Sequence, residues 1–553
     1  METDFVADKV PDLVPIDGVE RAGTEFRAPL TVEISGDRLT VDSVAAVARN
    51  KSCVQLSQDP GLKEKISASR RLLEEKLQQG EIIYGVNTGF GGNVRFLIPP
   101  KDLERHQENL LQFMTCGCGP SLPDDTVRAA ILLRANALTK GYSGVRQIVI
   151  EKLLDLLNHD IAPVVPRYGS VGASGDLIPS AYIGRVLLGH GKVHYKGRLV
   201  EAKEALEQSG IAPLHLQAKE GLALINGTTV MTGIGALVIH DGAYLSLLTL
   251  ACSTLALEAL LATDDPFREA IQAVKNHPGQ LSAAQLCRGF LEGSGYVRNL
   301  DEIRDRIGRA RQNSGGEIIR SEEAIQSPYS LRCVPQGIGA VLDGLREHRT
   351  TIEREMNSVN DNPLVDPAEG RIYHTGNFYG GHVARAMDSW KIDLTTLGNW
   401  LHALMAMLVD DRFSHGLPPN LAPNPGLSTG FKGMQICLTS LVCAMRQRAN
   451  PSLIHTLPTE QYNQDMVSLG THSASTAMEM TELLQDATAI VLLGLCQAID
   501  LRGGGGPLGR GNRAIYEAVR DHVPFAEQDR PLDDDIYKVS KLIKTKAFDL
   551  PAF

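Results

Sequence analysis

The sequence predicts a mainly α-helical protein whose centre is a bundle of unusually long helices. Apolar residues recur at helical spacing over long segments, few stretches alternate as strands do, and glycine and proline gather in the intervening loops. The clearest helical segments are residues 124–158, 241–262, 383–410 and 475–501. Long helices that are apolar on much of their circumference need other helices to cover them, so we expect a homo-oligomer.

The N-terminal part is expected to be smaller and of mixed structure. Residues 31–50 combine a short alternating stretch with a helix that begins near Asp42 and Ser43, two residue types that cap helices. Residues 61–80 carry an apolar helical stripe that ends at Gly80. We divide the chain into a flexible arm (1–25), an N-terminal domain (26–220), a central long-helix bundle (221–501) and a C-terminal loop with helices (502–553).

Composition limits the classes of function. Of the 553 residues, 43% are hydrophobic and 22% are charged, which is typical of a soluble globular protein. The formal net charge of -10 argues against a nucleic-acid-binding protein, because such proteins usually carry a basic excess. The acidic N-terminus does not resemble a secretory signal, and nine cysteines without a CxxC pair indicate reduced thiols, so we expect a cytoplasmic protein.

One apolar segment raises the question of a membrane helix. Residues 243–263 are long and apolar enough to span a bilayer, but they include Glu258 and several serine and threonine residues. We therefore expect a buried core helix and no membrane partner. Cys116 and Cys118 are the only closely spaced cysteines, and without a second cluster of ligands they favour packing thiols over a metal site, so we predict no metal.

Common catalytic motifs do not occur in the sequence. It has no HExxH zinc motif, no GxxxxGK[ST] phosphate loop and no GxGxxG turn between a strand and a helix. The nearest candidate is GSVGASGD at residues 169–176, in which Asp176 stands where the GxSxG motif of serine hydrolases needs a glycine. Two interpretations stay open: a tight turn in which Asp176 caps the following helix, and a reactive Ala173-Ser174-Gly175 triplet.

The triplet can form an electrophile from its own backbone. The Gly175 amide nitrogen can attack the Ala173 carbonyl carbon, and loss of two waters, one involving the Ser174 hydroxyl, gives 4-methylidene-imidazol-5-one (MIO). Removing ammonia from an α-amino acid requires an electrophile, which no ordinary side chain supplies. The conjugated methylene of MIO accepts an amine, and glycine at the third position avoids a Cβ that would crowd the closing nitrogen.

Seven sequence blocks resemble, in family order, the histidine, phenylalanine and tyrosine ammonia-lyases and the related aminomutases. They are YGVNTGFGG (84–92), GSVGASGDL (169–177), KEGLALINGT (219–228), YSLRCVPQ (329–336), NDNPLVD (360–366), GFKGMQI (430–436) and TEQYNQDMVSLG (459–470). The resemblance covers residues 30–545 and looks most like a bacterial phenylalanine ammonia-lyase. It implies the helical fumarase/aspartase-like superfold, an N-terminal domain that carries the MIO loop and a lid, MIO as the only cofactor, and a homotetramer with shared active sites.

The resemblance also assigns roles around the triplet. It implies that Ala173, Ser174 and Gly175 form MIO autocatalytically and that Tyr84, on the glycine-rich lid loop, removes the β-proton of the substrate. The pKa of tyrosine is ordinarily about 10, so a tyrosine base needs nearby positive charge or hydrogen-bond donors. Asn226 resembles the residue that hydrogen-bonds the MIO oxygen.

Other residues are implied to hold the substrate. Arg332 resembles the carboxylate partner, and Tyr329 would face the same space if that segment is helical. The resemblance further implies substrate binding by Leu222, Asn362, Phe378, Lys432, Glu460 and Gln464. Of these, Asn362 is expected at the carboxylate, Lys432 and Glu460 at the amine, and Gln464 at the ring. Because Glu460 and Gln464 are four residues apart, we expect them on one helical face.

The identity of the substrate is read from the residues expected around its ring. Histidine-type members resembling this chain have a carboxylate at the Gln464 position, and tyrosine-type members usually have histidine at the Phe113 position. Phe113 and Met114 give an apolar wall here, which favours an unsubstituted phenyl ring because an unpaired buried phenol or imidazole costs about 1–3 kcal/mol. Methionine is adaptable in shape, so Met114 leaves open the acceptance of substituted rings.

The sequence therefore predicts a phenylalanine ammonia-lyase that converts L-phenylalanine to trans-cinnamate and ammonia. Three alternatives stay open. The first is an MIO-dependent phenylalanine or tyrosine 2,3-aminomutase, which uses the same ring and base. The second is a tyrosine ammonia-lyase, and the third is a non-catalytic helical scaffold of the same superfold.

Overall fold

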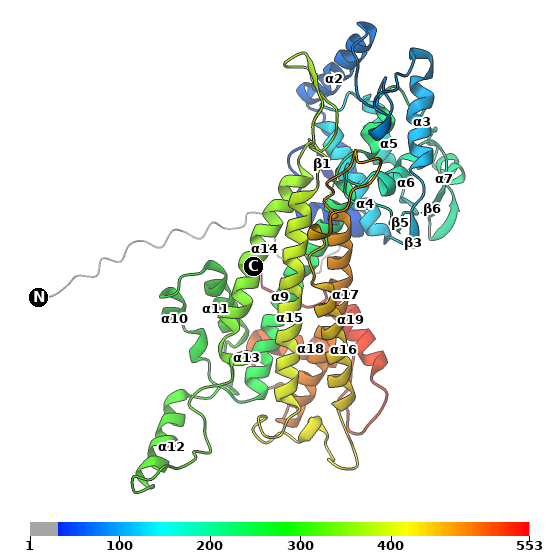
Figure 1. The fold of residues 1–553 in the computed structure, drawn as a ribbon. Helices are drawn as coiled ribbons and strands as arrows, with labels where there is room; N and C mark the ends of the chain where they lie inside the picture. The colour runs from blue at the N-terminus through cyan, green and yellow to red at the C-terminus, as the bar shows by residue number, and fades with distance from the viewer. Residues whose placement is uncertain (1–30, 552–553) are drawn as a thin grey trace, which may run out of the picture.

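The computed structural model describes residues 31–551, and the expected arm at 1–25 lies outside them. Five long helices form a bundle, with a head of smaller elements at one end and a protruding group of helices along its side (Figure 1). The bundle helices are α9 (Thr229–Ala259), α14 (Val334–Met356), α15 (Gly381–Leu408), α16 (Lys432–Arg448) and α17 (Gly470–Leu501). The prediction of a mainly helical protein with unusually long central helices is confirmed.

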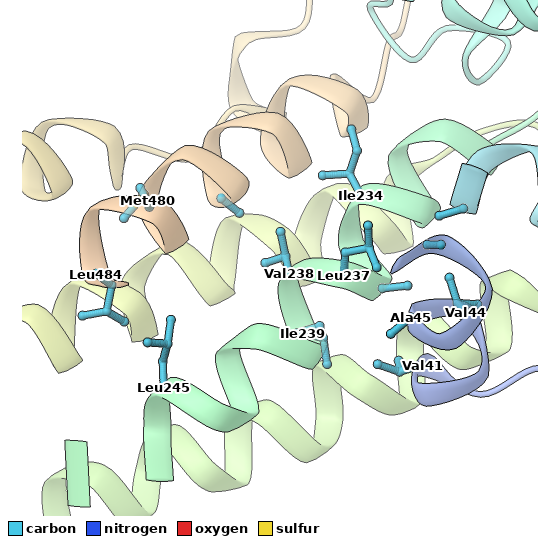
Figure 2. Packing of buried hydrophobic residues seen from close by; sticks show 14 of the residues in the cluster. Val41, Val44, Ala45, Ile234, Leu237, Val238, Ile239, Leu245, Met480 and Leu484 are labelled. Atoms are coloured by element: carbon cyan, nitrogen blue, oxygen red, sulfur yellow. The ribbon is translucent and has the colours of Figure 1, made fainter. Parts of the chain in front are cut away.

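The helices α9 and α17 form the apolar centre of the bundle. Ile234, Val238 and Leu245 of α9 face Met480 and Leu484 of α17, while the start of α9 also packs on α1 (Figure 2). Each large apolar side chain buried in this way contributes about 1.5–3 kcal/mol. Both helices are long and apolar enough to cross a membrane, but 78% of the apolar window of each is buried inside the protein.

Glu258, the one acidic residue of the predicted core segment, lies in α9 and is fully buried. Its carboxylate accepts hydrogen bonds from the Gly509 amide at 2.7 Å and from Asn512 Nδ2 at 2.6 Å. A buried polar group is tolerated when it is hydrogen-bonded in this way. The carboxylate therefore joins α9 to the start of α18 (Arg510–Arg520).

The segment 124–158 was expected to be one long helix but forms two. Helix α4 (Asp124–Thr139) ends before Gly141 and Gly144, whose φ angles are 73° and 64°, and α5 (Gln147–Asn158) follows. Left-handed backbone of this kind ends a helix. Helix α4 is buried along nearly its whole length against α9, α1 and α5.

The head also contains the short strands. The parallel pair β1 (Val32–Ile34) and β2 (Val54–Leu56) flanks α1 (Val41–Arg49), whose N-cap is Thr40 in a reciprocal capping box with Ser43. The helix thus begins just before the predicted start. The other strands are β3 (Cys118–Ser121) paired with β5 (Pro166–Tyr168), β4 (Ile161–Pro163) with β6 (Lys192–Tyr195) and β7 (Arg198–Glu201), and β8 (Leu364–Asp366) with β9 (Arg371–Tyr373).

The remaining helices cover the head and the flanks of the bundle. In the head are α2 (Pro60–Gln78), α3 (Leu103–Phe113), α6 (Leu177–Leu187), α7 (Ala202–Gln208) and α8 (Glu220–Ile225). Along the bundle lie α10 (Glu269–Ala273), α11 (Pro278–Phe290), α12 (Leu300–Gln312), α13 (Tyr329–Arg332) and α19 (Asp533–Lys544). Helix α2 ends just before Gly80, whose φ of 77° agrees with the predicted C-terminal signal.

Candidate active site

A cavity of about 1060 Å³ opens in the head beside the glycine-rich loop. It is lined by segments far apart in the sequence: the loop 82–98, helix α3, the triplet loop, helix α8 and the loops near 362–379 and 460–466. The residues predicted from sequence that line it are Tyr84, Phe113, Met114, Ala173, Ser174, Leu222, Asn226, Asn362, Phe378, Glu460 and Gln464. The fold thus brings most of the predicted site together within one chain.

The triplet loop turns tightly at Gly175, close to the backbone of Gly227. Gly175 has a φ of 73° and pairs with Gly227, whose amide donates to the Ser174 carbonyl at 3.1 Å. A Cβ on Gly175 would lie 1.9 Å from the Gly227 carbonyl oxygen, so only glycine fits. Ala173 and Ser174 face the cavity, and the residues present therefore fit an MIO group formed from this triplet.

Asp176 does not cap the helix that follows it, as one interpretation of the sequence expected. Its fully buried carboxylate instead accepts hydrogen bonds from the backbone amides of Val230 and Met231, at 2.9 and 2.8 Å, in the first turn of α9. It also accepts hydrogen bonds from the hydroxyls of Ser170 and Thr471. Burial raises the pKa of Asp176, while these donors oppose that shift. The carboxylate thereby ties the triplet loop to the N-termini of α9 and α17.

Asn226 and Asn362 lie beside the triplet and are both buried. The Asn226 amide nitrogen donates to the Asn362 carbonyl oxygen at 2.8 Å and to Asp361 Oδ1 at 3.2 Å. The Asn226 amide oxygen is buried and has no hydrogen-bond partner. An unpartnered buried oxygen next to the triplet is a second observation that fits a bound group in the cavity.

Tyr84 lies at the base of the lid loop, with its hydroxyl toward Gly91. The Gly91 amide donates to that hydroxyl at 2.9 Å, and no other donor reaches it from residues 31–551. Burial raises the pKa of Tyr84; the Gly91 amide lowers it, and the Glu460 carboxylate raises it further. The described part of this chain therefore supplies Tyr84 with one hydrogen-bond donor but with no neighbouring positive charge.

Glu460 and Gln464 line the cavity but do not lie on a helix. Glu460, Gln461 and Tyr462 have φ angles of 52–61°, and the turn closes through a bridge between Thr459 and Gln464. The helical face expected from their spacing is therefore wrong. The Glu460 carboxylate accepts a hydrogen bond from the Gly92 amide at 2.8 Å, which joins this turn to the lid loop.

The far wall of the cavity is aromatic. The Phe113 side chain is 55% exposed, and its ring lies 6.4 Å from that of Phe90, which stacks on His106 at 4.1 Å. Sequence reasoning missed Phe90, His106 and His374 as cavity residues. Phe90 belongs to the YGVNTGFGG block and could have been found there. His374, whose Nε2 accepts from the Tyr84 amide at 3.1 Å, is 290 residues distant and gives no such signal.

Three predicted residues lie away from this cavity within the chain. Tyr329 and Arg332 form the short helix α13, and Lys432 begins α16; these elements lie toward the end of the bundle opposite the head (Figure 1). None of the three lines the cavity. The Arg332 guanidinium lies 4.4 Å above the Tyr329 ring, so these two side chains are in contact.

Comparison with known proteins identifies the family of this chain. A model of the aromatic amino acid lyases matches residues 39–521. The chain belongs to the aromatic amino acid lyase family. A histidine ammonia-lyase of Streptococcus sanguinis is 36% identical over 94% of this chain and 96% of its own length. In the family, members generally depend on MIO and act on small aromatic amino acids.

Solved structures of two family enzymes share the fold. The tyrosine aminomutase of Streptomyces globisporus superposes with a TM-score of 0.90 at 36% identity, covering 94% of this chain and 98% of that one. The phenylalanine aminomutase of Pantoea agglomerans has a TM-score of 0.89 at 34% identity, covering 94% and 100%. The predicted family and superfold are confirmed, and the chain is an enzyme of the carbon–nitrogen lyase class.

Proposed function

We propose that this enzyme deaminates L-phenylalanine to trans-cinnamate and ammonia with the help of MIO formed from Ala173, Ser174 and Gly175. The observation that carries the choice of substrate is the exposed Phe113 ring in the cavity wall, beside Phe90 and Met114. A phenyl ring leaves no polar group unpaired against such a wall. The neutral amide of Gln464 lies in the same cavity, where histidine-type members resembling this chain carry a carboxylate.

Different residues of this chain act on the two ends of the substrate. The MIO ring, once formed, supplies an electrophile for the substrate amine. Tyr84 lies on the same cavity and takes the β-proton, while Asn226 and Asn362 hold the polar end and Leu222 and Phe378 contact the apolar part. The lid loop, anchored through Gly92 to Glu460, excludes water from the reacting atoms.

The cavity also needs cationic groups, which we propose come from other subunits of a homotetramer. A substrate carboxylate needs a charged donor, and a Tyr84 base needs a lowered pKa, whereas Glu460 acts in the opposite direction. Arg332, Tyr329 and Lys432 lie on elements at the other end of the bundle, where a second chain running antiparallel would place them at this cavity. The site is then complete only in the assembly.

Subunit complementation tests this arrangement. Tyr84→Phe and Arg332→Ala homotetramers are each expected to be inactive. Co-expressed and purified as mixed tetramers, they should regain activity, because random pairing leaves roughly a quarter of the sites with both native residues. Activity per tetramer, with each chain carrying a different affinity tag, gives the measurement. No recovery in tetramers shown to contain both chains would contradict a shared site.

A second function is favoured by the structural comparisons, because both solved relatives described above are aminomutases. An aminomutase would return ammonia to the β-carbon. The deciding experiment incubates the purified enzyme with L-phenylalanine, L-tyrosine or L-histidine and follows both arylacrylate absorbance and chromatography of β-amino acids. Cinnamate without β-phenylalanine supports the lyase, and β-phenylalanine as the main product supports the mutase. Inertness of the protein toward all three amino acids would reject both.

Changing Phe113 should change the preferred ring. Phe113→His is expected to raise kcat/KM for L-tyrosine relative to L-phenylalanine by about tenfold or more, because the imidazole gives the buried phenol a partner worth about 1–3 kcal/mol. Met114→Leu is the matched control, since it alters the neighbouring position without adding a polar group. The ratio of kcat/KM values for the two amino acids is measured. An unchanged ratio in Phe113→His would remove Phe113 from the ring pocket.

A further inference from the structure

A fully buried ion pair lies directly behind Asn226 and outside the predicted site. Lys219 Nζ and Asp361 Oδ2 are 2.6 Å apart, and the two side chains are 0% and 2% exposed. Lys219 begins helix α8 with a left-handed φ of 78°, and Asn226 ends the same six-residue helix. The ion pair and the site residue therefore sit at the two ends of one short, buried element.

The other oxygen of the carboxylate reaches the site. Asp361 Oδ1 accepts hydrogen bonds from Asn226 Nδ2 at 3.2 Å and from the Asn362 backbone amide at 2.7 Å. The next residue, Gly227, donates its amide to the Ser174 carbonyl oxygen at 3.1 Å. A continuous chain of contacts thus runs from the buried Lys219 ammonium to the reactive triplet.

These contacts determine which end of the Asn226 amide faces the cavity. An amide nitrogen and oxygen are distinguished by their partners. Both partners of the Asn226 side chain, the Asp361 carboxylate and the Asn362 carbonyl oxygen, can only accept hydrogen bonds. The nitrogen must therefore point toward them, which leaves the oxygen as the free end, buried and without a partner on a residue that lines the cavity. This orientation differs from the hydrogen bond that the resemblance implied for Asn226, because an amide oxygen cannot donate to the MIO oxygen.

We propose that Lys219 and Asp361 are positioning residues that hold the Asn226 amide with its oxygen toward the cavity, where that oxygen accepts a hydrogen bond from the amino group of the substrate. The proposal rests on the proposed function, because it requires an amine as substrate. Lys219 Nζ donates to Asp361 Oδ2 at 2.6 Å, which fixes Oδ1 against the Asn226 nitrogen. The opposite rotamer of the amide would set its oxygen against this carboxylate and the Asn362 carbonyl oxygen. A protonated or neutral group at position 361 could donate to Asn226 and would release this constraint.

The test compares the binding affinities of a ligand with an amino group and a ligand without one. The parent is Ser174→Ala, which cannot form MIO and so binds without turnover. The test variant adds Lys219→Met and Asp361→Leu, which removes both charges of the pair together. The matched control adds Lys391→Met and Asp388→Leu, another buried pair 2.8 Å apart whose residues do not line the cavity. Calorimetry then gives Kd for L-phenylalanine and for 3-phenylpropanoate, which lacks the amine.

The expected result is a selective loss. L-Phenylalanine should bind the test variant about tenfold or more weakly, because its amine loses a fixed acceptor in a buried site, while 3-phenylpropanoate binds unchanged. The control pair should bind both ligands as the parent does. Equal weakening of both ligands, or no weakening of either, overturns the positioning role. If the parent binds L-phenylalanine, L-tyrosine and L-histidine not at all, the proposed function itself is rejected together with this inference.

A more conservative variant serves as the test if the protein with the apolar pair at 219 and 361 does not fold. Lys219→Met with Asp361→Asn retains the shape of residue 361 and one acceptor oxygen, but its new amide can also donate to Asn226 Oδ1. L-Phenylalanine should then bind severalfold more weakly and 3-phenylpropanoate unchanged. Unchanged binding of both ligands by this folded variant also overturns the proposal.

Discussion

Gly175→Ala is expected to abolish deamination, with a loss of about a thousandfold or more in kcat, because MIO can no longer form. The added Cβ would lie 1.9 Å from the Gly227 carbonyl oxygen, and the φ of 73° is unfavourable for alanine. The backbone at Gly175 must therefore shift, which disturbs the turn from which the ring would form. Turnover of L-phenylalanine, measured beside the mass of the triplet peptide, checks the prediction.

Gly210→Ala is the matched control for Gly175→Ala. Gly210 has a similar φ of 68°, but a Cβ there would meet nothing within 4 Å. It therefore carries the cost of the backbone conformation without the collision and should leave kcat unchanged. Native activity of Gly175→Ala would show that the triplet does not form the electrophile.

Removing the charge next to Tyr84 is expected to shift the pH dependence of the reaction. Tyr84 acts as a base only when ionised, and its raised pKa means that kcat/KM should climb as pH rises through the alkaline range. Glu460 contributes to that raised pKa, so Glu460→Gln should lower it and move the rising limb toward lower pH. Tyr84→Phe should lose about a hundredfold or more in kcat at every pH, because no base remains.

The pH profiles of kcat/KM for the native enzyme, Glu460→Gln and Tyr84→Phe provide the measurement. Gln464→Glu is a useful companion, since it adds a carboxylate to the same cavity instead of removing one. A rising limb that stays in place in Glu460→Gln, or moves to higher pH, would contradict the assignment of Tyr84 as the base that Glu460 influences.

The long helices could be predicted because their periodicity is local. The apolar stripes of α9, α15 and α17 repeat over many turns, and burial on the neighbouring helices makes that pattern decisive. The break between α4 and α5 was missed, because the glycines at 141 and 144 are ordinary loop residues until their left-handed backbone is seen. The same limit applies to the turn at Glu460, where a spacing of four residues wrongly indicated a helix.

The residues of the site could be predicted from the sequence, but their arrangement in space could not. The family resemblance implied eleven residues that line one cavity, although nothing local in the sequence shows that Asp176 binds the first turn of α9 rather than its own helix. The contact between Lys219 and Asp361 spans 142 residues and had no sequence signal. The position of Arg332 relative to the cavity depends on how the subunits assemble. The sequence pattern of a single chain does not describe that assembly.

We propose that Ala173, Ser174 and Gly175 become the electrophile of a carbon–nitrogen lyase. Mass spectrometry of the peptide that contains residues 173–175, isolated from the native enzyme and from Ser174→Ala, tests this most directly. The native peptide is predicted to be lighter than its sequence by the mass of two water molecules, and the Ser174→Ala peptide to have the mass of its sequence. A native peptide of full mass, isolated from enzyme that deaminates L-phenylalanine, would show that this triplet is not the electrophile.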